Sequence, residues 1–190
     1  VQALAAALDA ALDRLPDPPD QGRPRLPVDR VFTMRGSGTV VTGTLIDGEL
    51  RLGQELEVQP DGLHTRVRGL QSHRKKLDTI PAGSRTAVNL GGLAVEDLRR
   101  GQVLAAPGTL KPTRAIDARL RLISDARPVR HNAQVTFHTG AAETLGKLSL
   151  LDRDELRPGE EAWVQVRLRD EVALARGDLF ILRLPSPSMT

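Results

Sequence analysis

The chain has 190 residues, of which 39% are hydrophobic and 27% charged, so it has enough apolar material for one or two folded domains. It contains no Cys, which excludes disulfides, thiolate catalysis and cysteine-ligated metal sites. With three Phe, one Trp and no Tyr, it cannot offer a series of base-stacking platforms. A net charge of +3 is mildly basic and suits phosphate contacts. No apolar run approaches the ~20 residues of a membrane span.

The N-terminal segment has the pattern of a helix followed by a linker. Residues 1–15 place leucines at helical spacing among alanines, which are the best helix formers. Pro16 ends this pattern, and the five prolines within residues 16–27 predict a stiff, extended linker. The chain has neither an initiator Met nor a signal peptide. We therefore expect residues 1–25 to be the C-terminal helix and linker of a missing upstream domain.

Residues 26–108 have the pattern of a small barrel. Short segments rich in Val, Leu, Ile and Thr are interrupted by Gly at short intervals, which is typical of strands joined by tight turns. A small open sheet would leave exposed edges, and closure into a barrel removes them. We therefore predict a closed β-barrel over this range.

A second set of strands is predicted over residues 113–187. The segment AIDARLRLI alternates apolar and charged residues, and a hairpin is expected to turn near residues 139–141. Val164, Val166 and Leu168 fall on one face of a further strand. The predicted fold class is therefore all-β: two consecutive small antiparallel β-barrels, preceded by a short helix and a proline-rich linker.

No motif in the chain indicates catalysis. GTVVTG has the glycine spacing of a phosphate-binding loop, but Thr44 stands where that mechanism needs a Lys, and the motif lies in a strand pattern. The four His residues lack metal-ligand spacing. Asp152, Asp154 and Glu155 lie among arginines and are interpreted as a solvated turn. We therefore expect a binding module with no catalytic residue, no metal site and no cofactor of its own.

Several motifs resemble the translational GTPases of the EF-Tu type. The stretch VDRVFTMRGSGTVVTGTLIDGELRLGQELEVQP is similar to their second domain, in which GTVVTG is a recurring signature. The QSH, AGSRTAVNLGG and RRG segments resemble the SelB family of selenocysteine-specific elongation factors. DRDELRPGEE and ARGDLFILRLPSP resemble the third domain of that family. The resemblance covers about residues 26–187.

This resemblance implies a role in protein synthesis. SelB family members deliver selenocysteinyl-tRNA to a ribosome stalled at a recoded UGA codon, and they work in the cytoplasm without a membrane. Residues 26–108 would be domain II, which holds the aminoacyl end, and residues 113–187 would be domain III, which contacts the tRNA arms. GTP and Mg²⁺ would bind a GTPase domain, and a C-terminal region would bind the mRNA. Both regions are absent here, so we expect this fragment not to be an enzyme.

The resemblance also implies an aminoacyl pocket. The positions that match it are Asp29, Arg30 and Arg85. We assign the arginines to the selenolate, because a fixed cation favours this anion over the neutral hydroxyl of the competitor serine. Asp29 is expected to orient an arginine or to meet the α-ammonium group. Neighbouring residues of a regular strand point to opposite faces, so Asp29 and Arg30 can share a pocket only at a strand end or a bulge.

Basic residues on predicted polar faces are candidates for contacts to the tRNA backbone. Such contacts release counterions from the RNA and set its position, but they do not identify the amino acid. The candidates are Arg74, Lys75, Lys76, Arg119, Arg121, Arg127 and Arg130, to which His131, Arg167 and Arg169 are added.

Three alternatives remain open. The same barrels occur in factors that carry ordinary aminoacyl-tRNAs, and in GTPases that regulate an enzyme, such as the sulfate adenylyltransferase subunit. A neutral amino acid needs no anion cage, so Arg30 and Arg85 favour the selenocysteine interpretation over the first. The third alternative is a purely structural barrel pair, which predicts no shared basic face.

Overall fold

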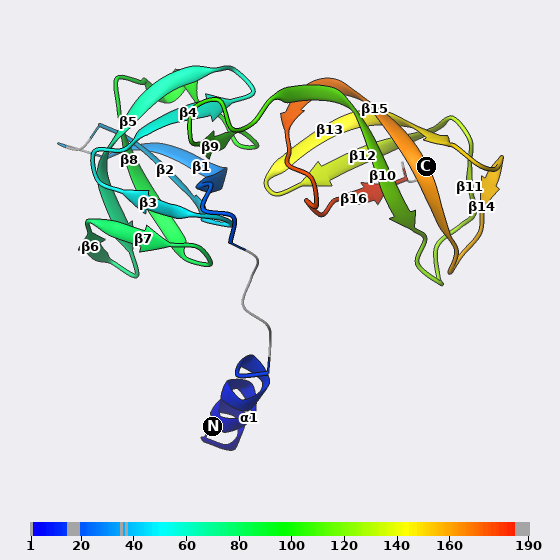
Figure 1. Cartoon of the computed structure of the whole chain (residues 1–190), viewed down its shortest axis with the longest axis horizontal. Coiled ribbons are helices and arrows are strands. Elements are labelled where there is room, and N and C mark those ends of the chain that lie inside the picture. Colours follow the sequence, from blue (N-terminus) through cyan, green and yellow to red (C-terminus); the bar gives the residue numbers. More distant parts are fainter. Residues whose placement is uncertain (1, 15–19, 35, 37, 185–190) are drawn as a thin grey trace, which may run out of the picture.

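The computed structural model describes residues 2–14, 20–34, 36 and 38–184. Within these residues, one short α-helix precedes two domains of antiparallel strands (Figure 1). The predicted all-β, barrel-type fold with a short leading helix is confirmed. Residues 15–19, the first part of the predicted linker, lie outside the described residues.

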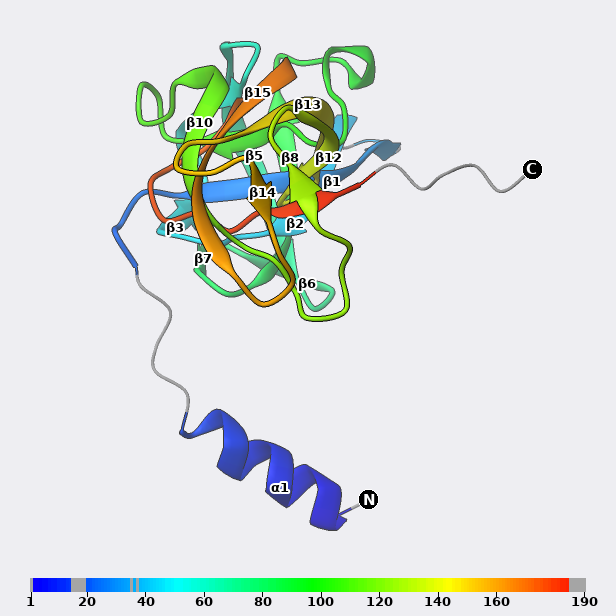
Figure 2. The ribbon, with the colours of Figure 1, turned by 90° about the vertical axis from the view of Figure 1, so that its right-hand side faces the viewer.

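Helix α1 (Gln2–Leu12) has an apolar stripe that the described part of the chain does not cover. Leu4, Leu8 and Leu12 are 66%, 55% and 62% exposed, and none of the described helix residues is buried. Both views show the helix away from the two domains (Figures 1 and 2). Burying such a stripe is what stabilises a short helix in a protein, so this helix needs a partner surface.

The first domain is a closed barrel, because β4 pairs with β5 and completes a ring in the order β4-β9-β1-β2-β8-β5. The ring strands are β1 (Arg25–Met34), β2 (Gly38–Thr44), β4 (Glu55–Gln59), β5 (Leu63–Ser72), β8 (Arg85–Gly91) and β9 (Val103–Ala105). The additional elements are β3 (Glu49–Arg51), β6 (Lys75–Leu77), β7 (Thr79–Pro81) and the 3₁₀-helix η1 (Val95–Asp97). Of these, β6 pairs with the outer part of β5.

Alternation along the strands fills the barrel interior. Leu56 and Val88 are completely buried, and the residues on either side of each along β4 and β8 are exposed or only partly buried. Gly43 allows two strands to approach closely. A Cβ at this position would collide with the carbonyl oxygen of Pro27 and would lie 2.6 Å from Leu26 Cδ2. The second glycine of GTVVTG is therefore a packing residue of the barrel.

The second domain is an antiparallel sheet in the order β10-β15-β13-β12-β16. Its strands are β10 (Pro112–Arg121), β12 (Ala133–Thr139), β13 (Ala142–Leu150), β15 (Glu161–Ala173) and β16 (Ile181–Arg183). A separate two-stranded ribbon is formed by β11 (Val129–Arg130) and β14 (Glu155–Leu156). The predicted hairpin is confirmed: β12 and β13 are joined across Gly140.

This second sheet curls around its own core. Val164, Val166 and Leu168 share one face as predicted, and that face is buried in the core; the fully buried Phe137 stacks on Phe180 with ring centroids 5.4 Å apart. In the described part of the chain, no strand bridges the two outer strands β10 and β16, so the hydrogen-bonded ring is closed only in the first domain.

The two domains contact each other through an ion pair and a small apolar cluster. Arg25 Nη1 donates hydrogen bonds to both carboxylate oxygens of Asp178, at 2.7 and 2.9 Å. The Arg25 side chain is 13% exposed, so this pair is largely removed from water. The cluster consists of Val103, Ala105, Leu110 and Ala173. The contact therefore combines apolar burial with a directed charge pair.

Candidate functional site

A bulge in β1 determines where Asp29 points. The pairing of β1 with β2 shifts register between Val28 and Arg30, so Asp29 is the additional residue. Asp29 Oδ1 accepts a hydrogen bond of 2.7 Å from Thr42 Oγ1. Its two carboxylate oxygens also accept from both terminal nitrogens of Arg85, with 3.0 Å between Arg85 Nη2 and Oδ1. Three adjacent strands, β1, β2 and β8, thus build one bidentate ion pair.

Both members of this pair are charged at neutral pH. The hydrogen bonds from Arg85 hold the pKa of the Asp29 carboxyl below its usual range, against the opposing effect of burial. The bond from Thr42 and the charges of Arg85 and Arg30 lower this pKa further. Asp29 likewise raises the pKa of Arg85. The Arg85 side chain is 50% exposed, so the guanidinium is held in place while it still faces solvent.

Arg30 lies beside this pair without joining it. The residue is exposed, and it makes no ion pair with any residue that the structure describes. Its charge nevertheless acts on Asp29, as the lowered pKa of that carboxyl shows. The structure thus brings the three predicted pocket residues to one place, with one arginine neutralised and one available.

A cavity of about 680 Å³ lies on the same outer face of the barrel, across β2, β8, β5 and β6. We call it the groove. Its floor includes Val40 and Leu70, which are 4% and 3% exposed. Its rim carries the exposed apolar side chains Met34, Leu52 and Leu77. Polar side chains from β5 and β8 also line it.

Strand register connects the groove to the ion pair. Thr42, which binds Asp29, is paired with Ala87, and Ala87 lines the groove. Ala87 is also paired with Gln71, which lines the groove from β5. Arg85 is two residues along β8 from Ala87 and on the same face. The ion pair therefore stands at one end of the groove.

The basic turn after β5 contributes one residue to this face. Lys76 lines the groove, whereas Arg74 and Lys75 do not. Arg74 has a φ of 64° in the tight turn between β5 and β6. The groove also contains Arg68, which the sequence analysis did not single out. Arg66 and Arg68 look equivalent in the sequence, and only the strand register distinguishes them.

The candidate cations of the second domain divide into paired and unpaired residues. Arg119 forms an ion pair with Glu161, and Arg130 with Glu155 at 3.4 Å. Within the described residues, Arg121 and Arg127 form no ion pair. Of these residues, Arg119 and Arg121 line a cavity of about 770 Å³ between β10 and residues 174–180. His131 Nδ1 lies 3.0 Å from the carbonyl oxygen of Leu150.

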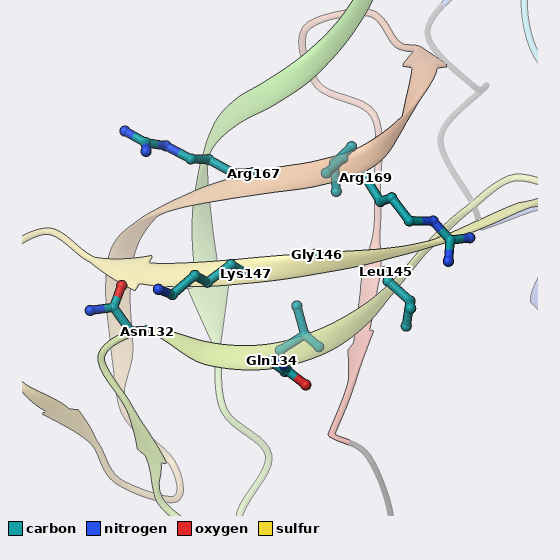
Figure 3. A pocket seen from close by; sticks show the side chains of 9 residues that line it. Asn132, Gln134, Leu145, Gly146, Lys147, Arg167 and Arg169 are labelled. Carbon is teal, nitrogen blue, oxygen red and sulfur yellow. The ribbon is translucent and has the colours of Figure 1, made fainter.

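A basic cavity of about 520 Å³ lies over β12, β13 and β15 (Figure 3). We call it the hollow. Lys147, Arg167 and Arg169 contribute its positive charges. Arg169 pairs with its neighbour Asp170 at 3.0 Å, and Arg167 Nε donates to Gln165 at 3.3 Å. Arg167 and Arg169 thus have partners that are close in sequence, and Lys147 forms no ion pair with a described residue.

Neither a metal centre nor a membrane span emerges from the described residues. No group of three or more His, Asp or Glu side chains there could hold a metal ion. The one described helix is too short to cross a bilayer.

Two family models match successive parts of this chain. The Elongation factor Tu domain 2 family matches residues 38–105, and the family "Selenocysteine-specific elongation factor, beta-barrel domain" matches residues 116–190. The selenocysteine-specific elongation factor of Desulfomicrobium baculatum is 52% identical over 167 residues, which cover 87% of this chain and 26% of that protein. Elongation factor Tu 2 of Streptomyces avermitilis is 32% identical over 94% of this chain and 48% of its own length.

A solved structure extends this similarity to three dimensions. The crystal structure of a bacterial selenocysteine-specific elongation factor, EF-Sec, superposes with a TM-score of 0.82 at 26% identity. The match covers 97% of this chain and 30% of that one. The chain thus spans about a quarter of the length of the Desulfomicrobium factor and under a third of the solved one.

Proposed function

The chain carries the two β-barrel domains of the selenocysteine-specific elongation factor family, and on this premise we propose that it binds selenocysteinyl-tRNA for delivery to the ribosome at recoded UGA codons. The observation that carries the proposal is the Asp29–Arg85 pair, built by a bulge at one end of the groove, with Arg30 unpaired beside it. The first domain would take the aminoacyl end, and the second would contact the tRNA arms.

The arrangement suits the chemical difference between selenocysteine and serine. A selenol is ionised near neutral pH, whereas a serine hydroxyl is neutral. Asp29 orients Arg85 by bidentate bonding and leaves one face of the guanidinium toward solvent. Arg30 adds a charge that no described carboxylate pairs. An entering selenolate would be attracted by both arginines, while a neutral hydroxyl would leave Arg30 without an anion.

The groove is shaped for the nucleoside that carries the amino acid. Its floor is apolar and its rim mixes exposed apolar and polar side chains, which is the combination that a flat, partly polar base requires. The ion pair at its end would then face the ester-linked amino acid. One surface would then bind the nucleoside that all aminoacyl-tRNAs share, and it would also discriminate between the amino-acid side chains attached to that nucleoside.

Catalysis and the remaining partners belong to other parts of a longer protein in this proposal. GTP and Mg²⁺ would bind a GTPase domain that precedes residue 1, and a C-terminal region would bind mRNA. The exposed leucine stripe of α1 supports the first point, because it offers a surface for such a domain to cover. The chain itself would have no enzymatic activity, and the protein would work in the cytoplasm.

The test compares two tRNAs on the full-length protein with GTP bound. In Arg85→Ala and Arg30→Ala, we expect the Kd for selenocysteinyl-tRNA to rise about 30-fold, equivalent to about 2 kcal/mol, because an anion loses a charge partner. The Kd for seryl-tRNA should change less than about threefold.

The matched control is Arg66→Ala, because Arg66 is an exposed arginine of the same barrel that pairs with Glu55. It should leave both tRNAs unaffected. Equal losses for both tRNAs in the Arg85 and Arg30 variants would remove the arginines from selenocysteine recognition. Binding of ordinary aminoacyl-tRNAs, or of an enzyme subunit in place of tRNA, would favour the alternative GTPases with the same barrels.

A further inference from the structure

We propose that Arg68, which lies across Gly91, and Lys76 bind phosphate groups of the tRNA strand that leads into the groove. The inference rests on the proposed function, since it assumes that the groove holds the aminoacyl end. It assigns the phosphate-binding side of the groove to two residues that play no part in recognising the amino acid.

A second bulge gives Arg68 its position. In the pairing of β5 with β8, Val67 faces Leu90 and Gly69 faces Asn89, so Arg68 is the additional residue. Arg66, on the other side of the bulge, pairs with Glu55 of β4 instead. Two arginines that alternate regularly in the sequence are thus separated, and only Arg68 lines the groove.

Gly91 provides the space in which Arg68 lies. A Cβ at Gly91 would come within 2.8 Å of Arg68 Nε and 3.4 Å of Arg68 Cδ. The arginine side chain therefore rests on the backbone of β8, where any larger residue would displace it. A guanidinium placed in this way has a restricted position, which lowers the entropy that it loses on binding an anion.

The charges along the groove are distributed unequally. Arg85 at one end is paired with Asp29, whereas Arg68 and Lys76 form no ion pair with any described residue. Asp78 is the one carboxylate among the lining residues, so two cations face one anion. Besides Arg30 at the amino-acid end, the groove itself therefore carries positive charge that its one lining carboxylate does not balance.

The register places these groups in order along the groove. Lys76 is paired with Gln71, which is level with Ala87, and Arg68 lies over Gly91. Arg85 and Gly91 are six residues apart on β8, which corresponds to about 20 Å of strand. An extended nucleotide strand whose terminal amino acid reached Arg85 would pass Lys76 and then Arg68 with its phosphates.

Arginine and lysine are chemically suited to this role. A guanidinium donates two parallel hydrogen bonds to a phosphate, and an ammonium acts as a point charge. Contacts of this kind act on every tRNA equally, because phosphates carry no information about the attached amino acid. They also depend on salt, with a slope of about 0.7 per phosphate for single strands.

The experiment measures Kd for selenocysteinyl-tRNA and seryl-tRNA over a NaCl series on the full-length protein with GTP bound. We expect Arg68→Gln to weaken both tRNAs by a similar factor of about ten, and to reduce the salt slope by about 0.7. Gly91→Ala keeps the charge but displaces it, so it should reproduce part of this loss. Arg66→Gln is the matched control and should stay within about twofold of the unsubstituted protein.

The outcomes separate this inference from the proposed function. An Arg68→Gln variant that behaves like Arg66→Gln, or that loses only selenocysteinyl-tRNA, would overturn the phosphate role. If the unsubstituted protein binds neither tRNA, the proposed function fails and this inference fails with it. Thermal unfolding of each variant verifies that the barrel is intact.

Discussion

Both domains carry cations beside a cavity on their outer surface, which is the groove in the first domain and the hollow in the second. The two domains hold these cations differently. In the first domain, a bulge directs the carboxylate of Asp29 onto Arg85 from another strand, 56 residues away in sequence. In the hollow of the second domain, Arg169 is paired with the adjacent Asp170, and Lys147 forms no ion pair among the described residues. A guanidinium held bidentately by a carboxylate from another strand is oriented by the fold, and we expect it to contribute to ligand selection. Cations held locally attract phosphates without selecting among them.

The largest effect is expected from breaking the barrel that supports the groove. Gly43→Ala should lower the free energy of unfolding by about 3 kcal/mol, because its Cβ would collide with the backbone carbonyl oxygen of Pro27 and with the fully buried side chain of Leu26. At Gly146 of the second domain the nearest atom would be Arg167 O at 3.0 Å, so Gly146→Ala should cost about 1 kcal/mol. Urea unfolding of the 190-residue chain measures both.

Gly69 provides the control for this pair of variants. A Cβ there would meet only the Cβ of Asn89 at 3.6 Å, which is an ordinary contact. Gly69→Ala should therefore leave stability almost unchanged. Equal losses of stability in Gly43→Ala and Gly146→Ala would contradict this expectation, because they would mean that neighbouring strands approach each other equally closely in both domains.

Acid should weaken the Asp29–Arg85 pair. The pKa of Asp29 is lowered in the folded protein, so its stabilising effect is present above the unfolded value of about 3.9 and is lost as the pH falls through the lowered value. The difference in melting temperature between the unsubstituted chain and Asp29→Asn should be fully present at pH 7, and it should begin to shrink only below about pH 4 and vanish as the pH falls through the lowered pKa of Asp29.

The matched variant in the second domain is Asp152→Asn. Arg153 also lowers the pKa of Asp152, but the two residues are neighbours in sequence, so we expect the unfolded chain to keep them close together as well. The melting temperature of this variant should therefore show little dependence on pH. A larger acid effect at Asp152 than at Asp29 would contradict the distinction between long-range and local pairs.

The smallest effect is expected from the hollow. Lys147→Gln should weaken selenocysteinyl-tRNA and seryl-tRNA equally, by about threefold, with a reduced salt slope, because a loose cation contributes only phosphate attraction. Arg119→Gln and Arg130→Gln should change binding less, since Glu161 and Glu155 already neutralise these arginines. A change in the preference between the two tRNAs would show that the second domain also reads the amino acid.

Part of the candidate site could be predicted from residues alone. The GTVVTG motif and the segments around Asp29 and Arg85 were recognisable because they occur in a known order along the chain. The requirement for a strand end or a bulge at Asp29 followed from strand alternation, and the structure has a bulge there. Arg68 could not be separated from Arg66, because both fit the same alternation and their difference depends on the register with β8.

The strands, their turns and the division into two β domains were determined by the sequence itself, because alternation and glycine placement act over a few residues. The tertiary structure decided which charges meet. It paired Asp29 with Arg85 across three strands and laid Arg68 over Gly91, and it left Arg30 unpaired within the described residues. These outcomes depend on register and closure, which place residues far apart in the chain within hydrogen-bonding distance, and no local pattern encodes that distance.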